Sequence, residues 1–347
     1  MILNAYAVLD SCTALLRLVV GLVTAVLAFS LWRRWNAETR AEWQTAREDR
    51  SYLVFLLANL LLILSVVSWP LLYLLLQSYV PEWPDVMCIY GVTQVGAGSV
   101  GPSRFLPGLL AAMQVLKPAL VFLAGSWFVL YLLNRRTHTS PLMPRVLLAV
   151  FLFGMLAGCD AAIEGAYLII PKKEEFLSAG CCTGAFDAEE HASGFFSESS
   201  WSENSASWIA PVYYLVNIGM ALALLGYILL PAWRKSPVRL LPLCLGALVS
   251  WPVAGLFLIV IAAPRLLHLA HHHCPYDLLP AAPESVVALG WFVLGSFCAG
   301  WAWLAACCGR SPETVPFLGQ EVGKLLRLAL WGYAGSTIML SLELALA

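Results

Sequence analysis

The chain has 347 residues, of which 60% are hydrophobic and only 12% are charged, and its mean hydropathy is +0.78. A water-soluble domain has about 25% charged residues, so this chain could not cover its own surface in water. The composition excludes a soluble enzyme, a disordered protein and a disulfide-rich knot. The formal net charge of −1 leaves no basic field for nucleic acid. We therefore expect a polytopic membrane protein in a lipid bilayer, most simply the inner membrane of a bacterium.

Eight apolar stretches are long enough for transmembrane helices, each of which needs about 20 residues to cross the hydrocarbon. None shows the short alternating pattern of a membrane β-barrel, so we predict an all-α fold. The N-terminus carries Asp10 and no basic region, and its apolar run ends in Trp32-Arg33-Arg34, which indicates a retained first helix and not a cleaved signal peptide. In chain order, the expected spans are 12–32, 51–77, 107–133, 146–170, 209–231, 240–263, 285–306 and 323–346.

Basic residues gather in alternate connections, which the positive-inside rule assigns to the cytoplasm. The basic connections are 33–50, 134–145, 232–239 and 307–327. The intervening connections have few basic residues, namely Arg104, Lys172, Lys173 and Arg265. This pattern predicts that the N-terminus and the C-terminus both lie outside. Within 33–50, mixed charges and two tryptophans indicate a helical hairpin at the cytoplasmic interface.

A tripeptide match indicates a tandem duplication of a four-helix unit. Ser68-Trp69-Pro70 recurs as Ser250-Trp251-Pro252, and each lies in the second span of its half. Two further pairs of matches follow in the same order, namely Cys88-Ile89-Tyr90 with Cys274-Pro275-Tyr276, and Trp127-Phe128-Val129 with Trp291-Phe292-Val293. We predict two parallel halves, with the internal prolines kinking corresponding helices. Chance matching in a leucine-rich sequence is the alternative.

The duplication sets the expected domain organisation. Residues 1–206 form the first unit together with an acidic outer loop at 171–206, and residues 207–347 form the second unit. The loop could receive a soluble extracytoplasmic partner with a positive surface, or it is an ordinary solvated loop.

Four of the ten cysteines lie in outer loops on this topology, and they are candidate catalytic thiols: Cys88, Cys181, Cys182 and Cys274. An oxidising outer compartment permits disulfides, and the duplication favours pairing of Cys88 with Cys274. Cys181 and Cys182 are adjacent, so a disulfide between them would be strained. They could pair elsewhere, bind a soft metal or act as a thiol pair. Structural disulfides, redox chemistry and metal binding all remain open.

A four-helix membrane unit with outer cysteines is similar in architecture to the quinone-coupled disulfide-forming enzymes and the vitamin K epoxide reductases. Those proteins use a Cys-x-x-Cys pair, and this chain contains none. The similarity is therefore one of architecture and implies no activity. A metal ion, haem or quinone is the cofactor to look for.

Histidines are concentrated directly before Cys274, at His268, His271, His272 and His273. If the sixth span continues outward as a helix, three of these imidazoles share one face at spacings i, i+3 and i+4. Imidazoles so placed can bind zinc, copper or haem iron, and Cys274 would add a thiolate. A polar collar at the helix end and a pH-sensing cluster are the alternatives.

Ionisable residues also lie inside the expected spans. Asp160 and Glu164 share one face of the fourth span, Arg17 lies in the first, Lys117 in the third and Glu343 near the outer end of the eighth. A charge at mid-bilayer costs about 2.5–3.5 kcal/mol on insertion scales, so such groups face the bundle interior and pair. We expect Arg17 or Lys117 to pair with Asp160 or Glu164. The pairing would serve as a proton or cation relay, or as a buried ion pair that fixes helix register.

Three hypotheses for function follow. The first is a membrane redox or metal-handling protein that uses the outer thiols and histidines, with the intramembrane carboxylates moving protons. The second is a non-enzymatic subunit that scaffolds or anchors a larger membrane complex or transport system. The third is a secondary transporter. The sequence favours the first slightly, because a scaffold does not explain the run from His268 to Cys274.

Overall fold

The computed structural model describes residues 4–35, 42–82, 86, 88–96, 101–172, 207–234, 236–268 and 274–347. Within these ranges every regular element is helical and there is no β-strand. Eight of the described helices are long and apolar enough to cross a membrane, one for each predicted span. This confirms the all-helical, multi-pass character of the chain. Two compact units divide it, a first unit of Met1–Ala179 and a second unit of Gly180–Ala347.

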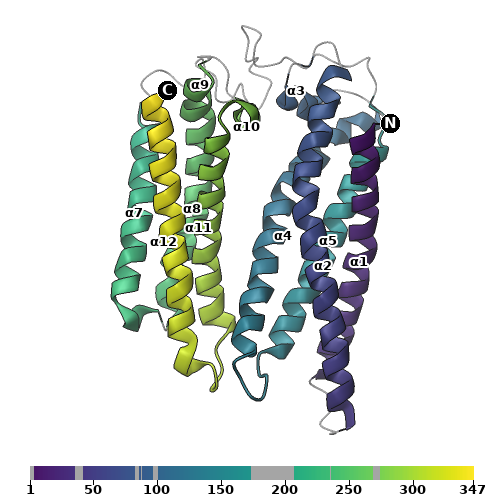
Figure 1. Cartoon of the computed structure of the whole chain (residues 1–347), viewed down its shortest axis with the longest axis vertical. Helices are drawn as coiled ribbons and strands as arrows, with labels where there is room; N and C mark the ends of the chain where they lie inside the picture. The colour runs from purple at the N-terminus through teal and green to yellow at the C-terminus, as the bar shows by residue number, and fades with distance from the viewer. Residues whose placement is uncertain are drawn as a thin grey trace. The chain divides into compact units, whose positions relative to one another are not determined.

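Four long helices make up the first unit (Figure 1), with the short elements η1 (Val80–Glu82), α3 (Ile89–Gln94) and η2 (Pro102–Phe105) between the second and third. The long helices are α1 (Ala5–Trp35), α2 (Glu42–Tyr79), α4 (Leu106–Asn134) and α5 (Met143–Ile169). α2 starts before the predicted span, because the charged segment from residue 42 continues as helix.

Glycines bring α1 and α5 close together. A Cβ atom placed on Gly21 would lie 3.0 Å from the carbonyl oxygen of Gly154 and 3.2 Å from the amide nitrogen of Gly158. Small residues of this kind let helix backbones approach each other in a membrane, where packing takes the place of hydrophobic attraction.

The second unit also has four long helices (Figure 1), and its second helix is broken near its end. They are α7 (Ile209–Leu229), α8 (Pro237–Phe257), α11 (Pro283–Cys308) and α12 (Val315–Leu346). The short elements are η5 (Pro231–Trp233), the π-helical turn η6 (Leu258–Ala262), α9 (Ala263–Leu266) and α10 (Leu278–Ala281).

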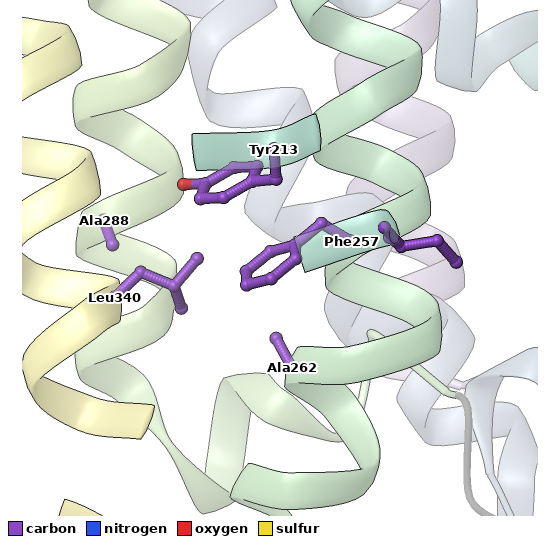
Figure 2. Packing of buried hydrophobic residues seen from close by; sticks show 6 residues of the cluster. Tyr213, Phe257, Ala262, Ala288 and Leu340 are labelled. Atoms are coloured by element: carbon purple, nitrogen blue, oxygen red, sulfur yellow. The ribbon is translucent and has the colours of Figure 1, made fainter. Parts of the chain in front are cut away.

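The π-helical turn follows Pro252 by six residues and comes directly after the packed residue Phe257. The ring of Tyr213 on α7 stacks on Phe257 with centroids 4.0 Å apart and an interplanar angle of 6°. Figure 2 shows these two rings beside Ala288 and Leu340. In the first unit, by contrast, α2 continues as α-helix through Pro70 to Tyr79. The two prolines therefore have different consequences for their helices.

The polarity of the first unit is reversed relative to a soluble protein. On α1, Leu15 and Val26 are 64% and 67% exposed. Asp10, Arg17 and Thr24 are fully buried, and their spacing of seven residues places them on one face of the helix. Apolar side chains thus face the expected lipid, and charged side chains face the inside of the bundle.

Candidate functional site: a buried charge cluster in the first unit

A group of charged side chains lies deep inside the first unit. Arg17 on α1 and Asp160 and Glu164 on α5 are 0% exposed, and Lys117 on α4 is 4% exposed. Arg17 follows the start of α1 by twelve residues, so it lies about 18 Å along the helix. Since α1 has 31 residues, Arg17 lies well away from both of its ends.

Each cation contacts both carboxylates. Arg17 Nη1 lies 2.7 Å from Asp160 Oδ2, and Arg17 Nη2 lies 2.6 Å from Glu164 Oε2. Lys117 Nζ lies 2.7 Å from Glu164 Oε2 and 3.3 Å from Asp160 Oδ2. The pairing predicted from the sequence is confirmed, with both cations engaged at once. The spacing i, i+4 on α5 is what presents the two carboxylates to the same partners.

Ser68 holds the two cations in place from α2. Its hydroxyl accepts hydrogen bonds from Arg17 Nη1 at 2.8 Å and from Lys117 Nζ at 3.1 Å. The same hydroxyl donates to the carbonyl oxygen of Ser65 at 2.8 Å. A hydroxyl has one proton and two lone pairs, so Ser68 is fully used. The Ser-Trp-Pro motif thus contributes its serine to this site.

Several carboxyl oxygens in this region receive no hydrogen bond from any described residue. They are both oxygens of Asp10, Oδ1 of Asp160 and Oε1 of Glu164. The Nε of Arg17 is the one described donor of these side chains that lacks an acceptor. Acceptors therefore outnumber donors, and a buried acceptor without a donor costs about 1–3 kcal/mol.

Asp10 is the residue that makes this site unusual. It lies on α1 two turns before Arg17, is 0% exposed and forms no ion pair among the described residues. Its carboxyl group interacts electrostatically with the Glu164 carboxyl group, and neither of its oxygens has a hydrogen-bond donor among the described residues. Two carboxyl groups can form a hydrogen bond only when one of them is protonated, because an ionised carboxylate is an acceptor alone.

The charges of this site do not balance unless a proton is bound. We call Asp10, Arg17, Lys117, Asp160 and Glu164 the charge cluster. Three carboxyl groups face two cations, which leaves one negative charge when all five groups are ionised. One proton makes the cluster neutral and also supplies the donor that a hydrogen bond between Asp10 and Glu164 needs.

The sequence analysis missed Asp10 and the role of Ser68. Asp10 lay outside the predicted first span, which began at residue 12, whereas α1 begins at Ala5. The spacing of seven residues between Asp10 and Arg17 was the signal that could have found it. Ser68 was noted as part of a repeat, and its burial beside the cations was not foreseen.

The second unit has a neutral counterpart at its matching serine. Ser250 on α8 donates to the Ala247 carbonyl at 2.7 Å, so the Tyr333 hydroxyl, 2.9 Å away, donates to Ser250. Ser296 on α11 lies 3.1 Å from the same tyrosine hydroxyl. Both serines are 0% exposed, but their partners lie on different helices. Ser68 contacts side chains from α1 and α4, whereas Ser250 contacts Tyr333 from α12. One centre is charged, and the other has only hydroxyl groups.

The Trp-Phe-Val match does not share this equivalence. Trp127 is buried and stacks on Phe55, whereas Trp291 is 39% exposed. In the second copy Phe292 is the buried residue. The two tripeptides therefore present different side chains to the interior of their units.

The other predicted site residues lie elsewhere or beyond the described ranges. Glu343 is half-buried near the end of α12 in the second unit, and neither carboxyl oxygen receives a described hydrogen bond. Cys88 is buried directly before α3, and Cys274 is buried shortly before α10. Five of the predicted site residues fall outside the described part of the chain, namely Cys181, Cys182, His271, His272 and His273.

The helix that would align the histidines ends before them. α9 ends at Leu266, and His268 has a φ of 54°, in the left-handed region that terminates a helix. His268 is exposed. α9 therefore does not extend to His268, and the imidazole face predicted for His268, His271 and His272 stays a prediction, because the last two lie outside the described residues. No protein family, curated protein or solved structure matches the chain, so its function is argued from the charge cluster.

Proposed function

We propose that this integral membrane protein is proton-coupled, and that its first unit takes up and releases one proton at the charge cluster. Asp10 carries the proposal, because it is fully buried and has no cation of its own among the described residues. The proton would lie between the carboxyl groups of Asp10 and Glu164. Its release would leave one uncompensated negative charge, which the surrounding helices would have to accommodate by a change of packing or hydration.

A purely structural role does not account for the third carboxyl group. An ion-pair network that fixes helix register needs only two anions for Arg17 and Lys117. A further buried carboxylate lowers stability, since an ionised group in a dry interior costs several kcal/mol. The third carboxyl group avoids that cost only while a proton is bound, which supports a role in taking up and releasing a proton. Intramembrane acidic residues commonly serve as proton relays in pumps and transporters.

The test is an electrical recording of proton binding. Purified protein in liposomes adsorbed on a solid-supported membrane is exposed to a rapid pH jump, and the transient charge movement is integrated. We expect a signal from the wild-type protein and at least a tenfold smaller signal from Asp10→Asn. The amide is nearly isosteric but cannot exchange a proton, so the cluster stays neutral without one.

Glu343→Gln is the matched control, because it removes a membrane carboxyl group from the second unit. It should keep the wild-type signal. An undiminished signal from Asp10→Asn would refute the proposal, and so would the absence of a signal from wild-type protein. That last result would favour a scaffold or anchor subunit, to be sought through co-purifying membrane partners.

A second candidate couples this proton to redox or metal chemistry of outer thiols. Its support is that Cys88 and Cys274 are both buried, each close before a short helix at the corresponding point of its unit. Thiol counting with and without reductant, an absorption spectrum and elemental analysis test this on purified protein. Metal, haem or quinone lost on Cys274→Ala would support it. Protein with no cofactor and with all outer cysteines in unreactive disulfides would exclude it.

We also propose that both termini lie outside and that the two four-helix units arose by tandem duplication. The basic connections support a cytoplasmic location for residues 134–145 and an outer location for both termini. An alkaline phosphatase fused after Ala347 should therefore be active, and one fused after Arg136 should be inactive. The matching burial of Ser68 and Ser250 supports tandem duplication. An experimental structure in which the two serines do not coincide after superposition of the units would argue against it.

A further inference from the structure

One basic residue lies at the end of the first unit where α1 begins and α5 ends. Lys172 follows the last residue of α5 by three positions and is half-buried. Its amine donates a hydrogen bond to the carbonyl oxygen of Tyr167 at 2.8 Å. The same nitrogen lies 4.5 Å from the centre of the Tyr167 ring and 5.4 Å from that of Tyr79. Both distances are within the range of a cation–π interaction.

The two tyrosines connect this amine to the charge cluster. Tyr79 on α2 and Tyr167 on α5 are 0% and 2% exposed. Each interacts electrostatically with the carboxyl group of Asp10. The two tyrosines therefore contact Lys172 and also interact electrostatically with Asp10.

We infer that Lys172 makes the charge cluster selective for protons over metal cations such as sodium. The inference rests on the proposed function. A metal cation that approaches Asp10 from this end would have to shed water beside a fixed ammonium group that already occupies the faces of both tyrosine rings. Like-charge repulsion in such a partly desolvated place is stronger than in water. A proton can pass by exchange along hydrogen-bonded groups and does not need the ammonium to move.

Burial also sets the pH range in which the barrier works. It lowers the pKa of Lys172 from 10.5 to about 8, because partial removal from water disfavours the charged amine. The titratable groups that face the amine are Tyr79 from α2 and Tyr167 from α5. Asp10 from α1 interacts with both tyrosines, and Glu82 interacts with Tyr79. Below pH 8 the amine is charged and repels cations. Above pH 8 it is neutral, and the barrier against sodium is lost.

The experiment is a sodium jump at constant pH and ionic strength on the same solid-supported membrane. Below pH 8, wild-type protein should give no sodium-driven charge movement, whereas Lys172→Met should give one. In sodium buffer, Lys172→Met should also lose at least half of the proton-driven signal that it gives without sodium. Above pH 8, wild-type protein should respond to sodium, and Lys172→Arg should not, because arginine stays charged. Arg104→Gln is the control, since Arg104 is an exposed cation of the same unit that stacks on Phe105.

The outcomes separate this inference from the proposed function. If wild-type protein gives no proton-driven signal, the proposed function fails. If that signal is present but Lys172→Met responds to sodium no more than Arg104→Gln does, the selectivity role of Lys172 is overturned alone. A proton-driven signal from Lys172→Met in sodium-free buffer verifies that this variant is folded.

Discussion

Arg17→Met is expected to lower the free energy of unfolding by about 3–5 kcal/mol, the usual cost of removing one partner of a buried ion pair. Arg17 makes charge-assisted hydrogen bonds to Asp160, Glu164 and Ser68. Without it, Lys117 alone faces three carboxyl groups. The substitution makes α1 more apolar, so a loss of stability cannot be attributed to poorer membrane insertion. Reversible unfolding in mixed detergent and SDS micelles measures the change.

Two further variants serve as a control and as a partial rescue for this prediction. Arg33→Met removes an exposed arginine from the end of the same helix and should change stability by less than about 0.5 kcal/mol. Glu164→Gln added to Arg17→Met removes one opposing charge and should recover part of the loss. Equal effects of Arg17→Met and Arg33→Met would mean that the charge cluster does not hold the first unit together.

Gly332→Ala is expected to destabilise the second unit by about 1–3 kcal/mol through overpacking. A Cβ atom at this position would lie 2.5 Å from Gly295 Cα and 2.7 Å from the carbonyl oxygen of Trp291. Both neighbours are backbone atoms, so α11 and α12 would have to separate. Thermal unfolding in detergent, followed by the loss of monodisperse protein, measures the effect.

Gly290→Ala is the matched control on α11, because nothing lies within 4 Å of its added Cβ. Alanine is the better helix former by about 0.5–1 kcal/mol, so this variant should be as stable as wild type or more so. If both alanine variants had the same stability, the close approach of α11 and α12 at Gly295 and Gly332 would be wrong.

The transmembrane helices and the pairing of charges could be predicted, because the lipid bilayer imposes both. A membrane span must be long and apolar, and a charge inside it must find a partner. Asp160 and Glu164 lie four residues apart on one helix, so their shared face was readable. Nothing in the sequence stated which cations would reach them, and only the packing of α1, α4 and α5 shows that Arg17 and Lys117 both do.

Asp10 was not placed in the first span, because hydropathy locates the apolar centre of a span better than its ends. Helix ends depend on local contacts, and the same limitation affected His268, where the helix stops two residues earlier at Leu266. The contact between Gly295 and Gly332 depends on which helix faces come together. Composition and spacing do not contain that information.

The infrared absorption of protonated carboxyl groups tests the central claim most directly. A pH-difference spectrum of the purified protein, recorded in H₂O and in D₂O, detects the C=O stretch of a carboxylic acid and its isotope shift. We predict one such band that titrates in the wild-type protein and in Glu343→Gln and is missing from Asp10→Asn. A band that persists in Asp10→Asn, or its absence from wild-type protein at every pH, would contradict a shared proton at Asp10 and Glu164.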